Sequence, residues 1–490
     1  MNERFDPLLS GAMPGTDPAD MPAARLEARF AAQRRAFATD LYPSREARQD
    51  RLDRVLRLTE DHQQEIAAAI SEDFGHRSRQ ETELTEIFIV LSALRHTRRH
   101  LGRWMRPRRV ATPLHLWLAR SEILRQPLGV VGVISPWNYP FQLGMLPVAA
   151  ALAAGNRVLL KPSELTPRFS EVLQRIVAAA FAADEFAVIP GDVAVGRAFA
   201  ALPFDHLLFT GSTAVGRQIA LAAAQNLTPV TLELGGKSPA IVDADCDFAE
   251  AAPRIAFAKL LNAGQTCVAP DYVLVPRARV DAFVAALSAA VGTMYPAFAD
   301  NADYTSIVSA RHYERLRGLI DDAAAQGATA VRLGNATSAD GASVRKFHPT
   351  ALVGATDAMA VMQEEIFGPV LPVLPYDTLD EAIAGINARP RPLALYWFGS
   401  SAAHRDRVLR ETIAGGVTVN DACWHVAQEN LPFGGVGASG SGAYHGETGF
   451  LAFTKQKPVL HQSRLSGLPL FRPPYGRRFD ALIGLLKRYF

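Results

Sequence analysis

The stretch Val-Thr-Leu-Glu-Leu-Gly-Gly-Lys (230–237) decides how this 490-residue chain is organised. Its first five residues are β-branched or apolar apart from Glu233, a composition that is typical of a buried strand. The pair Gly235-Gly236 follows immediately. We expect the chain to pass near this pair from one α/β unit to a second one.

Apolar strands alternate with helical sequence on both sides of this point. Before it, strands are expected at 128–134, 157–161, 186–190 and 206–210, with helices that include 142–154 and 168–183. After it, strands are expected near 240–242, 272–275, 371–374, 393–398 and 416–419. Such alternation predicts parallel β-α-β units. The fold class is therefore α/β, with two α/β domains in series.

The segments that precede residue 128 have a different character. Residues 1–20 are rich in Pro, Gly and Asp, which predicts a loose segment. Residues 22–75 are expected to be helical. Their apolar face consists of Leu52, Val55, Leu56, Ile66 and Ile70.

Residues 94–110 contain seven arginines and two histidines. Because no basic excess persists elsewhere, we favour a solvated helix that ends at Pro107 over a nucleic-acid surface. His96 and His100 have helical spacing, but no acidic residue completes a metal site with them. We interpret both as surface residues.

The bulk composition excludes several classes of function. The chain has 51 basic and 49 acidic residues, so its net charge of +2 gives no argument for a nucleic-acid partner. Three cysteines without zinc-site spacing predict a reducing, cytoplasmic location and no metal. No apolar run is long enough to span a membrane. The apolar C-terminal stretch 479–490 is expected to form a surface or partner-docking helix, with weak membrane-surface contact as the alternative.

The candidate chemistry begins with Cys267, in Asn-Ala-Gly-Gln-Thr-Cys-Val-Ala-Pro (262–270). A thiol nucleophile and a desolvated carboxylate such as Glu233 together suit covalent acyl chemistry. Cys246 lies among acidic neighbours that should raise its pKa, so we interpret it as inert. Cys423 lies beside Trp424, and either lines a substrate entrance or packs in the core.

A nucleotide site is indicated where residues 206–217 run from a strand through a turn into a helix. Gly211 permits a tight turn, Gly216 permits close packing, and the amides from Ser212 to Val215 can face a pyrophosphate. Taken alone, the pattern fits an ordinary turn equally well.

Two further segments bear on nucleotide binding. Lys161 and Glu164 end a predicted strand, where they can bind ribose hydroxyls or form an ordinary charged junction. The literal G-x-G-x-x-G at Gly435, Gly437 and Gly440 follows no strand, so we interpret it as a flexible, close-packed loop.

Taken together, these motifs resemble those of the aldehyde dehydrogenase superfamily over roughly residues 22–475. The motifs, in order, are Pro-Trp-Asn-Tyr-Pro (136–140), Lys-Pro-Ser-Glu (161–164), Phe-Thr-Gly-Ser-Thr-Ala-Val-Gly (209–216), Leu-Glu-Leu-Gly-Gly-Lys (232–237), Gly-Gln-Thr-Cys (264–267), Glu-Glu-Ile-Phe-Gly-Pro-Val (364–370) and Pro-Phe-Gly-Gly-Val-Gly (432–437). Cys-Val-Ala-Pro-Asp-Tyr (267–272) and Gly-Ala-Tyr-His-Gly (442–446) are similar to the class 3 branch. The helix at 80–87 and the arginine-rich segment after it are similar to bacterial coniferyl aldehyde dehydrogenases.

This resemblance implies a division of the chain. A loose segment (1–21) would precede a Rossmann-like cofactor-binding domain (22–235) with bridging strands near 107–127. A catalytic α/β domain (236–440) and a bridging strand with a C-terminal segment (441–490) would follow. The small bridging sheet would join subunits, and the class 3 branch implies a homodimer.

The resemblance also implies roles for individual residues. Cys267 would attack the aldehyde, Asn138 and the Cys267 amide would bind the oxyanion, and Glu233 would activate water against the thioester. The residues implied to contact NAD or NADP are Ile134, Ser135, Trp137, Lys161, Ser163, Glu164, Gly211, Ser212, Val215, Gly216, Leu234, Glu365 and Phe367. The aromatic residues Trp137, Tyr139, Trp424 and Phe433 lie near these motifs, and form either a wall for a planar substrate or core packing.

The expected function is NAD(P)-dependent oxidation of an aldehyde, coniferyl aldehyde or another aromatic one, to the acid. A medium- or long-chain aliphatic aldehyde is the alternative substrate. Transfer of the acyl group to coenzyme A is disfavoured by Glu233, and a catalytically silent scaffold is disfavoured by the intact motif residues. The sequence leaves the choice between NAD and NADP open.

Overall fold

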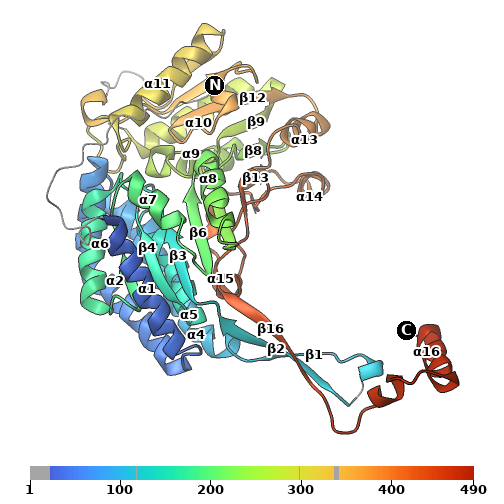
Figure 1. The fold of residues 1–490 in the computed structure, drawn as a ribbon. Helices are drawn as coiled ribbons and strands as arrows, with labels where there is room; N and C mark the ends of the chain where they lie inside the picture. Colours follow the sequence, from blue (N-terminus) through green and yellow to red (C-terminus); the bar gives the residue numbers. More distant parts are fainter. Residues whose placement is uncertain (1–21, 117, 297, 336–340, 490) are drawn as a thin grey trace.

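The computed structural model describes residues 22–489 except for 117, 297 and 336–340. The loose segment expected at 1–21 lies outside these described residues. Within them, the strands form three sheets (Figure 1). Two of the sheets are largely parallel and carry helices, and the third is a small antiparallel ribbon. The predicted α/β fold with two α/β units is confirmed.

The N-terminal region is helical, as predicted. Its helices are α1 (Pro22–Thr39), α2 (Arg45–Phe74), α3 (Arg79–Thr82), a π-helical turn at Glu83–Phe88, and α4 (Ile89–Trp104). Ser44 caps α2 by accepting a hydrogen bond from the amide of Ala47, and Gly75 ends the helix with a φ of 80°. Four residues of the predicted apolar face of α2 are buried, and Leu56 is half-buried.

The first large sheet has the strand order β15-β7-β6-β3-β4-β5. Its strands are β3 (Val130–Ile134), β4 (Arg157–Lys161), β5 (Phe186–Val188), β6 (His206–Gly211), β7 (Val230–Leu234) and β15 (Gly440–Ser441). All pair in parallel except β15, which is antiparallel to β7. The helices that follow these strands are α5 (Gln142–Ala154), α6 (Pro167–Ala180), α7 (Val193–Ala200) and α8 (Thr213–Ala224).

Alternate residues of these strands enter two different cores. Val131 and Val133 pack on the side of α2, α4 and α5. Val130 and Ile134 pack on the opposite side with Leu26 of α1. This two-sided burial explains why the parallel strands read as continuous apolar runs in the sequence.

The second large sheet has the order β10-β11-β12-β9-β8-β13-β14. Its strands are β8 (Pro239–Val242), β9 (Tyr272–Pro276), β10 (Thr329–Arg332), β11 (Thr350–Val353), β12 (Val370–Tyr376), β13 (Ala394–Phe398) and β14 (Gly416–Val419). Its helices are α9 (Phe248–Leu260), α10 (Val280–Met294), α11 (Ala310–Ala325), α12 (Ala360–Gln363), α13 (Leu379–Asn387) and α14 (Ala402–Glu411). The strands β10 and β11 were not predicted from the sequence. The chain changes sheet between Leu234 and Pro239, which confirms the switch expected at Gly235-Gly236.

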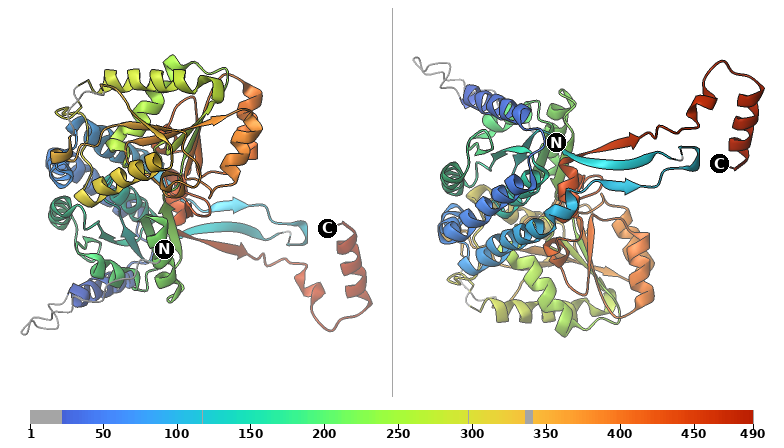
Figure 2. Two further views of the ribbon diagram at one scale, coloured as in Figure 1. Left: turned by 90° about the horizontal axis from the view of Figure 1, so that it is seen from above. Right: turned by 90° about the horizontal axis from the view of Figure 1, so that it is seen from below.

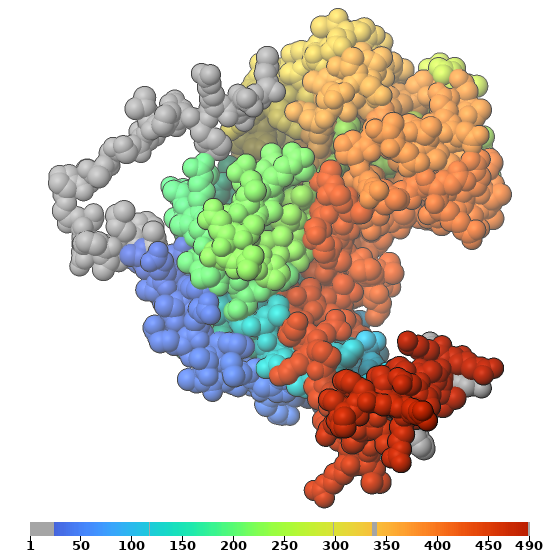
Figure 3. Space-filling model, turned by 45° about the vertical axis from the view of Figure 1, so that its right-hand side comes forward, coloured from blue at the N-terminus to red at the C-terminus, as the bar shows by residue number. Residues whose placement is uncertain are grey.

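The third sheet consists of β1 (Arg108–Val110), β2 (Arg120–Pro127) and β16 (Thr454–His461). It projects from the body of the molecule as an arm (Figures 1 and 2). The helix α15 (Gly446–Ala452) leads into it, and α16 (Arg477–Tyr489) lies beyond its end. Figure 3 shows the C-terminal segment as a lobe apart from the main body. No helix in the described part of the chain is long and apolar enough to cross a membrane.

The arginine-rich segment differs from its prediction in one respect. The helix α4 ends at Trp104 rather than at Pro107, because proline disfavours the helical conformation of the residue before it. Several arginines of α4 pair with acidic residues: Arg95 with Glu60 at 2.8 Å and Arg98 with Asp53 at 2.6 Å. These partners lie on α2, so the charges join two neighbouring helices. This pairing supports the interpretation of a solvated helical face.

Asn156 connects three parts of the first α/β unit. Its side-chain oxygen accepts hydrogen bonds from the amides of Leu128 (2.8 Å) and Gly129 (2.9 Å). Its side-chain nitrogen donates to the carbonyls of Ala151 (3.0 Å) and Phe453 (2.9 Å). The side chain is fully buried. It therefore ties the start of β3 and the end of α5 to the start of the arm.

We predict that Asn156→Ala lowers the free energy of unfolding by at least about 2 kcal/mol, because each buried polar group left unpaired costs about 1–3 kcal/mol. The midpoint of urea unfolding measures this effect. The matched control is Asn226→Ala, which removes one exposed hydrogen bond to Ala201 and should change stability by less than about 0.5 kcal/mol. Equal midpoints for the two variants would contradict the prediction.

Candidate active site

Cys267 lies in the loop between α9 and β9, after a strained turn. Asn262, Ala263 and Gly264 have positive φ values of 54°, 51° and 76°. Positive φ is unfavourable for Asn and more so for Ala, so surrounding contacts must hold this turn. A Cβ on Gly264 would overlap the carbonyl oxygen of Gly368. The turn therefore packs directly on the loop before β12 and fixes where Cys267 lies.

Gln265 holds the same loop from within. Its side-chain nitrogen donates to the carbonyls of Asn262 (2.9 Å) and Ser306 (3.1 Å). Its side-chain oxygen accepts from the amide of Val308 (2.9 Å). The side chain is completely buried, so it satisfies backbone groups that water cannot reach. Apart from the motif that contains Gln265, no feature of the sequence pointed to this role.

Glu233 lies in β7 and is buried, with 2% of its surface exposed. Neither of its carboxylate oxygens has a hydrogen-bond partner among the described residues. Burial raises its pKa well above the usual value. The predicted desolvation of Glu233 is thus present, and the carboxyl group is available for proton transfer.

The thiol of Cys267 shares this environment. Burial raises its pKa, and the nearby charges of Glu365 and Glu233 raise it further. Tyr444 belongs to the same cluster: burial raises the pKa of its hydroxyl, and the nearby charges of Glu233 and Cys267 raise it further. That hydroxyl has no partner in the described part of the chain. Three ionisable groups therefore lie in one largely buried centre.

Asn138 follows β3 and approaches this centre from the first α/β unit. Its side chain is 3% exposed and donates a hydrogen bond to the carbonyl of Gln265 at 3.1 Å. Gln265 is two residues before Cys267. The amide group of Asn138 thus lies against the cysteine loop, where a donor for an oxyanion is required.

The predicted cofactor residues gather at one edge of the first sheet. Ile134, Lys161, Gly211 and Leu234 end β3, β4, β6 and β7, which run in parallel. The carboxyl ends of parallel strands form the crevice where α/β folds bind ligands. The hydroxyl of Ser135 is buried there, with no partner among the described residues.

The helix α8 begins at the same edge. Ser212 caps it by accepting from the amide of Val215 at 3.4 Å. A Cβ on Gly216 would overlap the side chain of Leu234, so glycine lets the helix pack closely on β7. Lys161 forms an ion pair with Glu164 at 3.0 Å at the end of β4. An unpaired buried hydroxyl, a helix N-terminus and a lysine fit a dinucleotide with its phosphates and ribose hydroxyls.

Glu365 and Phe367 reach the centre from the loop before β12. A Cβ on Gly235 would overlap the carboxylate of Glu365, which also accepts a hydrogen bond from the backbone of Gly236. Burial raises the pKa of Glu365 to about 8, with the charge of Asp271 adding to the shift. The glycine pair is therefore needed for close approach as well as for the change of sheet.

A narrow cavity leads to Cys267, and its lining is mostly apolar. The lining residues are Leu84, Thr85, Ile89, Tyr139, Gln142, Leu143, Phe257, Leu261, Thr266, Cys267, Val268, Cys423, Trp424, Val426, Ala427, Phe433, Tyr444 and His445. Three of the four predicted aromatic residues belong to it. Trp424 stacks on Phe257 with ring centroids 6.3 Å apart.

Trp137 does not belong to the lining found among the described residues. Its ring packs instead against Phe74, His312 and Phe367, with centroids 6.1, 5.2 and 5.3 Å away. Of the two alternatives left open for Trp137, its contacts therefore fit core packing. The position of a ring relative to a cavity depends on long-range packing, which its neighbours in sequence do not reveal.

The other two cysteines, Cys423 and Cys246, lie in different surroundings. Cys423 lines the cavity, and its thiol lies 3.4 Å from the carbonyl oxygen of Val268. Burial is the main cause that raises the pKa of Cys246 to about 11, and its acidic neighbours add to the shift. The tyrosine and histidine of Gly-Ala-Tyr-His-Gly (442–446) also line the cavity. No role was predicted for these two residues from the sequence.

The literal G-x-G-x-x-G packs against the catalytic strand. Gly440 pairs with Glu233 in the antiparallel contact between β15 and β7. A Cβ on Gly435 would overlap the carbonyl oxygen of Ser439. These glycines serve backbone packing beside Glu233, so the close-packed part of the loop interpretation holds.

Comparison with known proteins agrees with this geometry. Residues 10–459 match the aldehyde dehydrogenase family. The chain is 48% identical to the coniferyl aldehyde dehydrogenase of Pseudomonas sp. strain HR199, over 90% of this chain and 92% of that protein. The structure of substrate-bound AldH from Staphylococcus aureus has a TM-score of 0.88 at 40% identity, covering 94% of this chain and 99% of that one. An aldehyde dehydrogenase of Mycobacterium tuberculosis complexed with NAD+ has a TM-score of 0.79 at 30% identity, covering 90% of each chain.

The family match spans most of the sequence, and the two structural likenesses cover nine-tenths or more of both chains. The site described above agrees with them, because its thiol, carboxyl and amide meet beside a nucleotide-type crevice. The chain therefore belongs to the aldehyde dehydrogenase family.

Proposed function

We propose that this enzyme oxidises an aromatic aldehyde of the coniferyl type to its carboxylic acid, with NAD or NADP as the hydride acceptor. The observation that carries the proposal is the apolar, partly aromatic cavity that leads to Cys267. A planar substrate would lie between Tyr139 on one element and Trp424 and Phe433 on others. The name of the Pseudomonas relative supports this substrate class.

In the proposed mechanism, Cys267 attacks the aldehyde carbon and forms a thiohemiacetal. The side chain of Asn138 and the amide of Cys267 stabilise the oxyanion, which is worth about 2.7–4 kcal/mol for one such donor. When bound, the oxidised nicotinamide would supply the hydride acceptor. Loss of a hydride from the thiohemiacetal carbon to the cofactor would leave a thioester on Cys267. Glu233 then takes a proton from water, and the resulting hydroxide attacks the thioester carbon, which releases the carboxylic acid and returns the thiolate of Cys267.

Different residues are proposed to contact each part of the cofactor. Lys161, Ser163 and Glu164 would contact the adenosine ribose, and the start of α8 would face the pyrophosphate. Glu365 would contact the nicotinamide ribose and Phe367 the nicotinamide ring. We also propose a cytoplasmic enzyme that works as a homodimer. The reduced cysteines and the projecting antiparallel arm support this part of the proposal.

We expect Cys267→Ala to abolish aldehyde oxidation, because it removes the thiol that forms the covalent bond. Binding of NAD should remain close to that of the wild type, since the cofactor crevice is unchanged. Calorimetric titration with NAD and a steady-state assay separate the two effects. Turnover near the wild-type rate would remove Cys267 as the nucleophile.

For Glu233→Gln we expect a rapid burst of reduced cofactor followed by slow turnover, because hydride transfer precedes attack by water. The raised pKa of Glu233 also sets a direction with pH. The base must be ionised, so steady-state turnover of the wild type should rise with pH, and the variant should lose this rise. Stopped-flow absorbance follows both phases. Loss of the burst itself would instead place Glu233 before hydride transfer.

The substrate class is tested with a panel of coniferyl aldehyde, benzaldehyde, hexanal and decanal, each with NAD and with NADP. We expect kcat/KM to be highest for coniferyl aldehyde. Aromatic stacking adds about 0.5–1.5 kcal/mol per good contact, which is roughly a 2- to 12-fold preference. Higher kcat/KM for hexanal or decanal would reject the aromatic assignment, and would favour the aliphatic alternative within the same family.

A further inference from the structure

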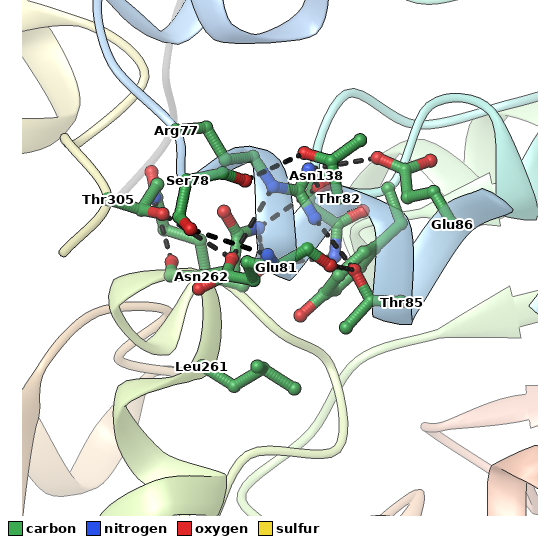
Figure 4. A network of polar contacts seen from close by, with 12 residues as sticks. Arg77, Ser78, Glu81, Thr82, Thr85, Glu86, Asn138, Leu261, Asn262 and Thr305 are labelled. Carbon is green, nitrogen blue, oxygen red and sulfur yellow. Dashed lines mark hydrogen bonds and ion pairs between the residues drawn. The ribbon is translucent and has the colours of Figure 1, made fainter. Parts of the chain in front are cut away.

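We propose that Arg77 is a positioning residue that, with Glu86, fixes the orientation of Asn138 in the active site. This inference rests on the proposed function, in which Asn138 donates to the oxyanion. Arg77 lies in the short link between α2 and α3, far from Cys267 in the sequence. Figure 4 shows its guanidinium between Glu86, Thr85 and the backbone of Asn138.

Arg77 is completely enclosed by protein. Its side chain has 0% exposure, as does that of its partner Glu86, and the two are 2.9 Å apart. A second carboxylate, that of Glu81 (8% exposed), lies 3.4 Å from the Nε of Arg77. The aromatic rings of Phe74 and Tyr139 lie 5.4 and 4.8 Å from the guanidinium carbon. A buried charge is costly unless it is paired and hydrogen-bonded. The pair therefore requires a reason beyond stability, and its contacts with Asn138 supply one.

The guanidinium contacts Asn138 directly. The nitrogen of Arg77 that pairs with Glu86 also donates to the carbonyl oxygen of Asn138 at 3.0 Å. The other terminal nitrogen donates to the hydroxyl of Thr85 at 3.2 Å. The contacts with Glu86 and Thr85 thus fix the orientation of the planar guanidinium group, which in turn holds the peptide group of Asn138.

Glu86 holds the residues that follow Asn138. Its second carboxylate oxygen accepts from the amides of Phe141 (2.7 Å) and Gln142 (2.9 Å), where α5 begins. Glu86 lies in the π-helical turn 83–88, an uncommon geometry that frequently marks functional sites. Burial raises the pKa of Glu86, and the charge of Arg77 opposes that shift. Arg77 therefore helps to keep both acceptor oxygens free of a proton.

The cysteine loop holds Asn138 from the other side. Asn262 donates to the carbonyl of Asn138 at 3.0 Å and to that of Gln265 at 3.1 Å. The side chain of Asn138 itself donates to the Gln265 carbonyl at 3.1 Å. One contact of Asn138 thus comes from Arg77 and the others from the loop that carries Cys267. Arg77 sets the position of the amide donor relative to the thiol.

A double-mutant cycle tests this role. The variants are Arg77→Lys, Asn138→Ala and the double variant, and the readout is the stopped-flow burst rate of reduced cofactor. Lysine keeps the charge but lacks the fork that serves Glu86, Thr85 and the Asn138 carbonyl together. We expect Arg77→Lys to slow the burst at least about 10-fold alone, a part of the 10²–10³ that one oxyanion donor contributes to kcat. In the Asn138→Ala background the further loss should be less than about 2-fold, because coupled residues are not additive.

The matched control is Arg51→Lys. Arg51 lies on α2, has a side chain that is 4% exposed, and pairs with Glu185 at 2.7 Å, away from the catalytic loop. The burst rate of Arg51→Lys should stay within about 2-fold of the wild-type rate. If Arg77→Lys does not fold, Glu86→Gln enters the same cycle from the other side of the pair, with the same expected non-additivity.

The possible outcomes distinguish the positioning role of Arg77 from the oxyanion role of Asn138. Equal slowing by Arg77→Lys in both backgrounds would show that Arg77 acts independently of Asn138, and would overturn its positioning role alone. A wild-type burst rate in Asn138→Ala would refute the oxyanion role of Asn138, and the role of Arg77 with it. Binding of NAD should stay close to that of the wild type in all variants, since none of the substituted residues is among those proposed to contact the cofactor.

Discussion

Burial of the Glu233 carboxyl group near the half-buried thiol of Cys267 is the constraint on which the rest of this structure depends. Both groups are ionisable, and burial raises the pKa of each. A carboxyl in this state can accept a proton near the working pH, whereas a solvated one would be too weak a base. The cost is that neither Glu233 oxygen has a partner in the described part of the chain. Such an unpaired group persists only where the surrounding fold holds it rigidly.

That rigidity comes from segments that are distant in the sequence. The residues after α2, the loop after β3, the turn at 262–264 and the loop before β12 all meet at the same centre. Their contacts are made largely through backbone carbonyls and amides, held by buried side chains such as Arg77, Glu86 and Gln265. Backbone groups shift little when they are anchored in this way. The reactive side chains therefore extend from backbone segments that have little freedom to move.

The two large sheets contribute different parts of the site. The first contributes the crevice at the carboxyl ends of β3, β4, β6 and β7, and the second contributes the cysteine loop before β9. Glu233 lies at the boundary, in the last parallel strand before the chain changes sheet. Gly235 lets the carboxylate of Glu365 approach at this boundary. A change of sheet thus coincides with the place where nucleotide, thiol and base must meet.

The sequence by itself determined the α/β class, most strand positions, the change of sheet and the motif residues. It could do so because local alternation of strands and helices and short glycine-containing motifs are encoded within a few neighbouring residues. It did not determine β10 and β11, the end of α4 at Trp104 or the packing of Trp137. Nor did it reveal that Arg77 contacts the backbone of Asn138, 61 residues away. Only the tertiary structure decided these points, because they depend on which distant surfaces share one desolvated space.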